Sequence, residues 1–336
     1  MADQEDQLPF ISVMIPLYNE ERYAAACVES LLQQDYPRER MEAFFVDGRS
    51  EDRTRLIIQE YAEQYPFIKL LDNPERTVPY ALNIAITQAK GIYIIRLDAH
   101  CEYATDYISQ CVRVLEDTGA DNVGGPMIAK GRTRVQSVIA ASYTSPFSLG
   151  GGKFHDAGYE GYVDTVYLGA YRKNIFGKAG LFDKDMIRNQ DDEMNYRILK
   201  SGGKIYLSPS IRSVYFPRST FRSLASQYFQ YGKWKALIIR KHGRPATLRQ
   251  FVPLLFVLFL VAGGIAAVLS PFIAIAYGSV LGLYLLLNAY FSFTNRLITG
   301  IGNLLLLMWT NIVLHTAYGA GFWAGFVICA FKPAIK

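Results

Sequence analysis

Cysteine is scarce in this sequence. The four cysteines among 336 residues are Cys27, Cys101, Cys111 and Cys329, and no two of them stand in Cys-x-x-Cys spacing. This pattern argues against a disulfide framework and fits a reducing, cytosolic setting for the soluble part of the chain. Met1–Gln7 is acidic and polar and lacks the basic and apolar regions of a signal peptide. We therefore predict no cleaved signal peptide.

Charge is nearly absent from the last third of the chain. After Gln250 the only charged residue before Lys332 is Arg296. The apolar runs at residues 251–269, 272–293 and 304–331 are each long enough to cross a bilayer. Because the last run is interrupted by His315 and several glycines, we predict two to four crossings and prefer three. Residues 250–336 are therefore predicted to form a transmembrane domain.

A basic, amphipathic stretch precedes the apolar third. The net charge is only +5. Its visible concentration is Lys233, Lys235, Arg240, Lys241, Arg244 and Arg249. This position suits anionic membrane lipids better than nucleic acid, and we predict no nucleic-acid partner. Aromatic and apolar residues recur at spacings of three and four over residues 219–242, which predicts an amphipathic helix in the membrane interface; the alternative is a packed surface helix.

These features predict three regions. Residues 1–218 form a soluble domain, residues 219–249 an interfacial helix region, and residues 250–336 the transmembrane domain. Basic residues before the first apolar run and at Arg296 place the soluble domain on the cytosolic side of the cell membrane.

Strand and helix patterns alternate over the first hundred residues. Short apolar runs at residues 10–17, 43–46, 67–71 and 92–97 are separated by amphipathic stretches. This alternation is typical of an α/β domain with a mostly parallel sheet wrapped by helices. In such a sheet, ligands bind beyond the carboxyl ends of the strands.

Carboxylates follow three of these strands. Glu20 comes after the first, Asp47 after the second, and Asp98 with His100 after the fourth. Two ligands one residue apart, such as Asp98 and His100, can hold one divalent cation, although an ordinary polar loop also ends this way. Asp47 is placed to accept a hydrogen bond from a nucleobase, or to cap the following helix. Arg76, Asn83 and Arg96 either contact a nucleotide or lie on the surface.

The ordered set of motifs resembles one enzyme family. The matching segments are Pro16-Leu17-Tyr18-Asn19-Glu20, Asp47-Gly48-Arg49-Ser50-Glu51-Asp52, Asp98-Ala99-His100, and Gln190-Asp191 followed by Arg197. Together they resemble family 2 inverting glycosyltransferases with the GT-A fold, a Rossmann-like nucleotide-sugar domain. The Asp-Ala-His form and the apolar C-terminal region resemble the membrane glucosyltransferases of succinoglycan-type exopolysaccharide synthesis. The set is more specific than any one of its members.

The resemblance implies roles for individual residues. It implies a divalent cation, Mn²⁺ or Mg²⁺, at Asp98 and His100; His100 replaces the family's second carboxylate, and imidazole suits Mn²⁺ better than Mg²⁺. Asp191 takes the place of the catalytic base, with Asp192 as the alternative and Gln190 on the acceptor side. The nucleotide-binding set implied is Pro16, Tyr18, Glu20, Asp47, Arg76, Asn83 and Asp98.

The implied reaction is a single displacement. A carboxylate takes the proton of an acceptor hydroxyl as it attacks the anomeric carbon, and a cation neutralises the departing nucleoside diphosphate. An α-linked donor then gives a β linkage. By resemblance the donor is UDP-glucose and the acceptor a polyprenyl-diphosphate-linked or other lipid-linked glycan.

A second motif leaves the mode of transfer open. Gln230-Tyr231-Gly232-Lys233-Trp234 resembles the Gln-x-x-Arg-Trp motif of processive synthases, with Lys233 in place of arginine. Gln230 and Lys233 then hold the diphosphate and Trp234 stacks on an acceptor sugar, or Trp234 is simply a membrane-interface residue. The hypotheses are therefore addition of one sugar, processive polymer synthesis, and a non-catalytic nucleotide-binding scaffold.

Overall fold

The computed structural model describes residues 8–243 and 248–331, and the chain forms two compact units. The first unit comprises Met1–Ile128 and Asp156–Tyr215, and the second comprises Ala129–His155 and Phe216–Lys336. The prediction about a signal peptide at Met1–Gln7, and Arg244 of the basic cluster, lie outside the described residues. Residues 129–155, which the sequence analysis assigns to the soluble domain, group instead with the C-terminal helices.

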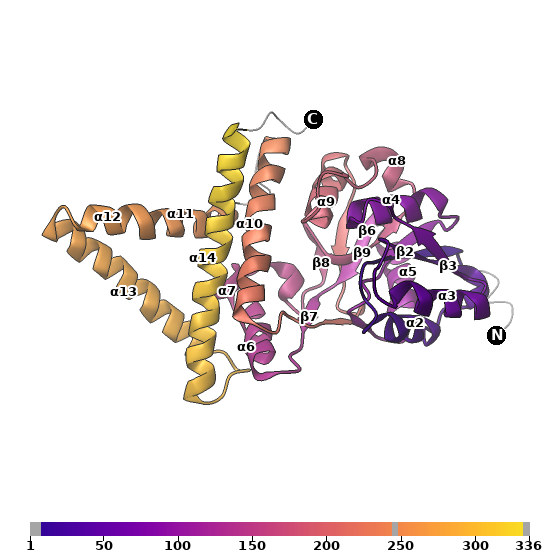
Figure 1. The fold of residues 1–336 in the computed structure, drawn as a ribbon, viewed down its shortest axis with the longest axis horizontal. Coiled ribbons are helices and arrows are strands. Elements are labelled where there is room, and N and C mark those ends of the chain that lie inside the picture. The colour runs from indigo at the N-terminus through magenta and orange to yellow at the C-terminus, as the bar shows by residue number, and fades with distance from the viewer. Residues whose placement is uncertain (1–7, 244–247, 332–336) are drawn as a thin grey trace. The chain divides into compact units, whose positions relative to one another are not determined.

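An eight-stranded sheet forms the centre of the first unit (Figure 1). Its strand order is β3-β2-β1-β4-β9-β6-β10-β8. The strands, in chain order, are β1 (Ile11–Leu17), β2 (Met41–Asp47), β3 (Ile68–Asp72), β4 (Tyr93–Arg96), β6 (Asn122–Gly125), β8 (Gly161–Tyr162), β9 (Tyr167–Arg172) and β10 (Ile205–Leu207). The predicted alternation of strand and helix is confirmed for the first four strands.

The sheet is mostly parallel, with β8 and β9 running against the other six strands. Strands β1 to β4 pair in parallel, as predicted, but β9 lies antiparallel between β4 and β6. The chain thus re-enters the middle of the sheet in the opposite direction. Residues 122–129 form two strands, because Pro126 has no backbone N–H and separates β6 from β7 (Met127–Ala129). β7 belongs to a small second sheet with β5 (Glu102–Tyr103) and β11 (Ser213–Tyr215).

Helices flank the large sheet. They are α2 (Ala24–Leu32), α3 (Thr54–Gln64), α4 (Val78–Gln88), α5 (Tyr107–Thr118), α8 (Ile175–Ala179) and α9 (Gln190–Lys200), with 3-10 turn η1 at Arg38–Arg40. Helix α5 shows the pattern most clearly: Ile108, Cys111, Val112 and Leu115 are buried at spacings of three and four. Gly119, at φ 63°, ends it with a left-handed residue that glycine adopts without strain.

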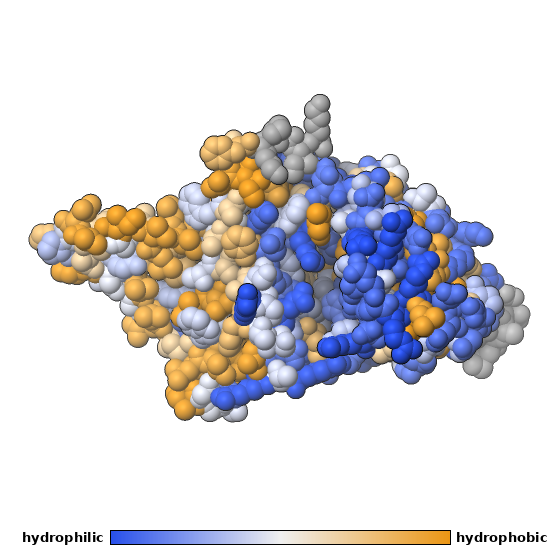
Figure 2. Space-filling model, viewed as in Figure 1, coloured by the Kyte–Doolittle hydropathy of each residue, from blue (hydrophilic) through white to orange (hydrophobic). Residues whose placement is uncertain are grey.

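The second unit is helical. Its elements are α6 (Arg134–Tyr143), α7 (Pro146–Leu149), η2 (Lys153–His155), α10 (Phe221–His242), η3 (Leu248–Phe251), α11 (Val252–Leu258), η4 (Phe259–Gly263), α12 (Gly264–Ala267), α13 (Pro271–Phe293) and α14 (Ile301–Phe331). Three helical segments are long and apolar enough to cross a membrane: Leu248–Ala267, Pro271–Phe293 and Ile301–Phe331. Figure 2 shows the apolar surface of α11 to α13 in orange. The sequence patterns predict neither α6 nor α7.

Candidate active site

The turns after β1, β2 and β3 meet at one edge of the sheet. The register pairs Leu17 with Asp47 and Asp47 with Asp72, so the three strands end level with one another. Just beyond each end a residue other than glycine has a positive φ: Asn19 at 54°, Arg49 at 57° and Arg76 at 58°. Left-handed residues of this kind cluster at binding sites, because surrounding contacts must hold them there.

Asp47 is fully buried within its own turn. Its carboxylate accepts hydrogen bonds from the Ser50 hydroxyl at 2.6 Å and the Ser50 N–H at 3.2 Å, and Arg55 lies 3.4 Å away. These contacts hold the Asp47 turn rigid. Capping of α3 is not its role, since Asp52 accepts the Thr54 N–H at 3.0 Å there.

An exposed cluster lies beside this turn. The Arg76 guanidinium lies 5.9 Å from the ring centroid of Tyr18 and donates to Glu51 at 2.9 Å. A Cβ on Gly48 would come within 3.4 Å of Tyr18 and of the Arg76 backbone. The turns after β1, β2 and β3 therefore bring an aromatic ring, a cation and a carboxylate together at the surface. Pro16 lies just upstream in β1, opposite Val46 of β2.

Arg96 joins the two carboxylates on which the predicted chemistry depends. It is the last residue of β4 and is 4% exposed. Its Nε donates to Asp98 at 3.0 Å, and its Nη1 donates to Asp191 in the first turn of α9. Asp98 and Asp191 are 93 residues apart in the sequence, yet one buried guanidinium bridges them. They therefore face the same site.

Asp191 combines a perturbed pKa with access to solvent. Burial by surrounding protein raises the pKa of its carboxyl; Arg96 opposes this effect, while Asp98 and Asp192 add to it. One third of its side-chain surface, 33%, nevertheless remains exposed. A partly exposed carboxylate with a raised pKa is the arrangement expected of a general base.

Helix α9 carries Asp191 in its first turn, because it begins at Gln190. Asn189, at φ 56°, turns the chain into the helix, and three acidic residues in the first turn match the positive end of the helix dipole. Asp191 is thus held on a helix terminus rather than in a loop.

The neighbours of Asp191 are anchored differently. Asp192 accepts from the Thr165 hydroxyl at 3.4 Å, and Thr165 in turn accepts from Asn195 at 2.9 Å. Gln190 is buried, 9% exposed. Arg197, the last residue of the predicted motif, pairs with the buried Glu193 at 2.8 Å and so ties the helix together rather than facing the site.

His100 and Glu20 lie near each other. The His100 Nδ1 is 3.8 Å from a Glu20 oxygen, and 42% of the His100 side chain is exposed. Among the described residues no group of three or more histidine, cysteine, aspartate or glutamate side chains is arranged to hold a metal ion. Asp98 and His100 supply at most one carboxylate and one imidazole. This donor set fits a cation that receives its remaining ligands from a bound diphosphate.

The remaining residues of the predicted set are Asn83 on α4 and three residues on α10. Both polar groups of the Asn83 amide pair with the Phe182 backbone, at 2.7 and 2.9 Å, so Asn83 ties α4 to the segment before α9. Gln230, Lys233 and Trp234 lie on α10 in the second unit.

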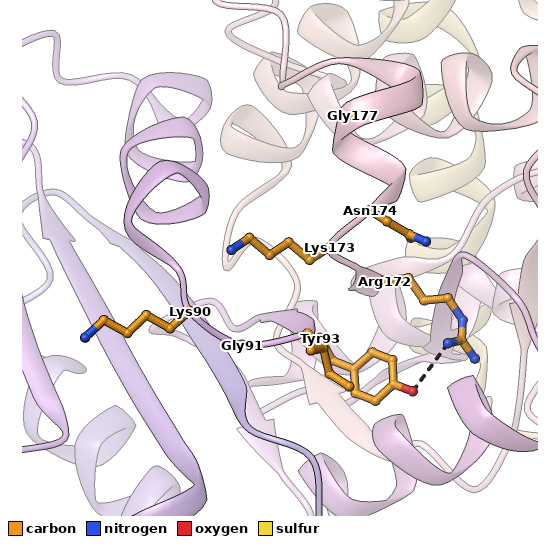
Figure 3. A pocket seen from close by; sticks show the side chains of 8 residues that line it. Lys90, Gly91, Tyr93, Arg172, Lys173, Asn174 and Gly177 are labelled. Atoms are coloured by element: carbon orange, nitrogen blue, oxygen red, sulfur yellow. Dashed lines mark hydrogen bonds between the residues drawn. The ribbon is translucent and has the colours of Figure 1, made fainter.

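A pocket at the start of β4 is distinct from this site. It has a volume of about 600 Å³ and lies at the start of β4, at the opposite end of that strand from Asp98. Figure 3 shows the Lys90 and Arg172 side chains pointing away from each other. Arg172 donates to the Tyr93 hydroxyl at 3.4 Å. The side chains do not converge on a ligand.

Sequence reasoning left the position of Arg96 open. The one indication of a buried position is that a charged residue ends an otherwise apolar run. A charged residue that is buried usually requires a partner. The partner, Asp191, comes from a segment that the sequence alone could not place beside β4.

Comparison with known proteins agrees with this geometry. Residues 12–179 match the family model described as glycosyl transferase family 2. The chain is 31% identical over 316 residues to the succinoglycan biosynthesis protein ExoA of Rhizobium meliloti, covering 93% of both chains. It is 34% identical over 240 residues to a dolichyl N-acetyl-alpha-D-glucosaminyl phosphate 3-beta-D-2,3-diacetamido-2,3-dideoxy-beta-D-glucuronosyltransferase of Methanococcus voltae, covering 69% of this chain and 74% of that one.

Solved structures share the fold. The mannosyltransferase PcManGT of Pyrobaculum calidifontis, in complex with GDP-Man and Mn²⁺, aligns with a TM-score of 0.60 at 19% identity, over 97% of this chain and 88% of that one. The S. aureus TarS 1–349 fragment in complex with UDP-GlcNAc aligns with a TM-score of 0.51 at 15% identity, over 94% and 91% of the two chains. The predicted GT-A fold is thereby confirmed. With the motifs gathered at one sheet edge and relatives matched over most of its length, the chain is a glycosyltransferase and belongs to glycosyl transferase family 2.

Proposed function

We propose that this protein is an inverting glycosyltransferase that moves one sugar from a nucleoside diphosphate onto a lipid-linked acceptor. The observation that carries the proposal is the bridge from Asp98 through Arg96 to Asp191. Asp98, which we assign to the diphosphate side, and Asp191, which we assign as the base, bind different nitrogens of the same guanidinium. A sugar bound between them would meet both.

Asp191 is the proposed base. A sugar hydroxyl is a weak nucleophile at neutral pH, so a carboxylate must accept its proton as it attacks the anomeric carbon. The raised pKa of Asp191 makes this carboxylate a better proton acceptor than an ordinary aspartate. Its exposed third leaves room for the acceptor hydroxyl. Attack from the face opposite the diphosphate inverts the anomeric centre, so an α-linked donor gives a β-linked product.

Asp98 and His100 are the proposed cation ligands. A divalent cation bound there would neutralise charge on the departing diphosphate. Arg96 fixes the Asp98 carboxylate through two of its nitrogens, at 3.0 and 3.4 Å. The imidazole of His100 favours Mn²⁺ over Mg²⁺. The Mn²⁺ bound to the structural neighbour PcManGT supports this assignment.

The nucleoside is assigned to the edge formed by the turns after β1, β2 and β3. Asp47 is proposed to contact the base from a rigid turn, and Tyr18 and Arg76 to flank the base and ribose. Pro16 and Glu20 shape the first turn; the Glu20 N–H donates to Thr54 at 2.7 Å. Asn83 is assigned an indirect role, because its amide already holds Phe182.

The relatives support the biological role and the acceptor. Similarity to the succinoglycan biosynthesis protein ExoA over nearly the whole chain supports a role in exopolysaccharide synthesis. UDP-glucose is the proposed donor because the sequence motifs resemble membrane glucosyltransferases. The dolichyl phosphate in the name of the M. voltae relative supports a lipid-linked acceptor. Such an acceptor suits a chain with three apolar helices. We assign the first unit to the cytosolic side of the cell membrane. Gln230, Lys233 and Trp234 of α10 are proposed contacts of the acceptor or diphosphate.

A donor screen tests the proposal. The full-length protein in lipid nanodiscs is incubated with single UDP- and GDP-sugars, with Mn²⁺, with Mg²⁺ or with EDTA, and nucleotide release is measured. We expect release from UDP-glucose with Mn²⁺, weaker release with Mg²⁺ and none with EDTA. Release from another sugar nucleotide alone would correct the donor, and no release from any donor would refute the activity. With a lipid acceptor added, a product longer by one sugar is expected, whereas a ladder of products would favour processive synthesis.

A further inference from the structure

Helix α14 packs along α10. A Cβ on Gly232 of α10 would lie 2.0 Å from the Tyr318 carbonyl oxygen, and one on Gly321 of α14 would lie 1.9 Å from that of Phe229. Further along, Arg240 donates to the Cys329 carbonyl. The two helices therefore run parallel, with their backbones in contact from the middle of α10 to its end (Figure 1).

This contact fixes the depth of α14 to that of α10. α10 carries Lys233 and Lys235 in its middle and Arg240 and Lys241 in its last turn. If α14 crossed the hydrocarbon core, α10 would have to cross with it, because Phe229 contacts Gly321 and Lys233 contacts Gly325. The first half of α10 would then lie beside the middle of α14 and carry the exposed Arg222 into the core, where charged side chains are strongly disfavoured. At the headgroup level, Arg222 and the lysines meet anionic phosphates.

The helical hairpin from α11 to α13 behaves differently. Only 6% of the apolar window in each of its two arms is buried, against 33% in α14. The start of the first arm contacts α14, where the Trp323 indole donates to the Leu254 carbonyl at 3.1 Å. The end of the second arm also contacts α14, where the Asn288 amide donates to the Met308 carbonyl at 3.0 Å. In Figure 1, α11 and α12 run across the direction of α14 rather than along it.

The tip of this hairpin is apolar. Val268, Leu269 and Phe272 are 80% exposed or more, and residues 250–295 contain no charged side chain. A surface of this kind needs hydrocarbon around it. Both arms are therefore anchored at α14 and extend from it into the bilayer.

α14 also has an exposed apolar stripe near its contacts with the two arms. Leu305, Trp309, Trp323 and Val327 are exposed at spacings that repeat with the helix turn. Tryptophan favours the membrane interface, and an in-plane helix exposes apolar residues on one side along its full length. The opposite side of α14 is covered by α10.

We infer that α14 does not cross the membrane but lies in the plane of its interface together with α10. The exposed stripe of α14 then contacts lipid at the boundary between headgroups and acyl chains. The α11–α13 hairpin is then the only part of the described chain that enters the hydrocarbon core, and both ends of α14 stay on the face from which the hairpin enters. This differs from the three crossings that the sequence favours, because hydropathy cannot register a partner helix.

Depth measurements along the stripe test the inference. Leu305→Cys, Thr316→Cys and Val327→Cys lie at eleven-residue intervals, about three helical turns each, and so share one face. Each is made with Cys329→Ser, which leaves only buried cysteines. The full chain is spin-labelled in vesicles of phosphatidylcholine and phosphatidylglycerol, and the depth of each label is read from its collisions with oxygen and with a nickel complex. Val280→Cys, exposed in the middle of α13, is the control for a deep position.

An in-plane helix places the three labels at equal depth and shallower than the label at 280. A crossing helix places the label at 316 about 16 Å deeper than the other two, which would overturn the inference. A shallow label at 280 would overturn it as well, because the hairpin would then lie outside the core.

Sidedness gives a second measurement that does not depend on depth. The protein with Phe331→Cys, again combined with Cys329→Ser, is reconstituted in sealed vesicles so that its first unit faces outward. It is then treated with a membrane-impermeant maleimide. Labelling without detergent is expected, because the end of α14 stays on that side. Labelling only after detergent would show that α14 crosses.

Discussion

At the scale of single residues, Arg96 has the most consequential position. A guanidinium that is 4% exposed requires anionic partners, and it has two, Asp98 and Asp191. It thereby fixes the position of both carboxylates before any substrate arrives. Positioning of this kind lowers the entropic cost of aligning the reacting groups.

Replacing Asp191 tests the base. Asp191→Asn keeps the shape of the side chain and its place on α9 but removes the proton acceptor. We expect kcat for transfer to fall by about 10² to 10⁴, with donor binding largely retained. Asp192→Asn is the matched control, because it changes the adjacent carboxylate by the same atoms, and it should keep most of the activity. If Asp192→Asn abolishes transfer while Asp191→Asn does not, the two assignments are exchanged.

The pH profile reports the environment of Asp191. The base must be ionised, so activity is lost as the pH falls through its pKa. Because burial raises that pKa, the acid limb should lie above the value of about 4 that is typical of aspartate. Arg96→Gln removes the charge that opposes this rise and should move the limb to higher pH, in kcat/KM measured from pH 4 to 9.

Arg76→Gln is the comparison for this measurement. Its charge pairs with Glu51 and is not among the groups that perturb Asp191. We expect a higher KM for the donor with an unmoved acid limb. A limb that stays fixed in Arg96→Gln would show that Arg96 does not act on the base.

Glu42 has a structural role at the other end of the sheet. Its buried carboxylate accepts from the Ser12 hydroxyl at 2.8 Å, the Lys90 N–H at 2.6 Å and the Lys69 ammonium at 2.6 Å. Burial alone would raise the pKa of Glu42, but the hydrogen bonds from Lys69, Lys90 and Ser12 outweigh it and leave the pKa lowered. The stabilisation is therefore complete above the unfolded pKa of about 4.3 and disappears as the pH falls through the lower folded value.

Glu42→Gln should lower the free energy of unfolding at pH 7 by about 1–3 kcal/mol. The difference from the original protein should shrink below pH 4, and urea unfolding in detergent at the two pH values measures it. Glu60→Gln, on an exposed position of α3, should change the stability by less than about 0.5 kcal/mol. Equal effects of the two substitutions would rule out a role for the buried network.

At the scale of elements, the close contact of α10 and α14 depends on glycine. Gly232→Ala places a methyl group 2.0 Å from the Tyr318 carbonyl oxygen, so the helices must separate. We expect a loss of about 1–3 kcal/mol, seen as a lower melting temperature of the purified protein.

The matched control is Gly278→Ala in α13, where a Cβ meets nothing within 4 Å. Alanine favours helix by about 1 kcal/mol over glycine, so this variant should be neutral or slightly more stable. A Gly232→Ala protein as stable as Gly278→Ala would mean that the two helices are not in close contact.

At the scale of the whole molecule, the apolar hairpin makes the membrane part of the fold. Its two arms have so little protein around them that lipid must cover them. We expect the protein to stay with membranes after extraction at pH 11 in sodium carbonate and to be released by detergent. Release by carbonate or high salt alone would show that only charge holds it at the surface.

The α/β alternation and the family could be predicted from the sequence, which also supplied the candidate site residues. These follow from local patterns: short apolar runs make strands, and the motifs follow the strand ends at Glu20, Asp47 and Asp98. It also located the apolar helices, because hydropathy is a property of a continuous segment.

Only the tertiary structure decided what lies beside what. The antiparallel entry of β9, the bridge from Asp98 to Asp191 and the packing of α14 on α10 all join segments 75 to 95 residues or so apart. Closing such loops is driven by the burial of the assembled core and not by any local pattern. For the same reason, the length and apolarity of α14 predicted a crossing, whereas its depth depends on the charged helix that packs against it.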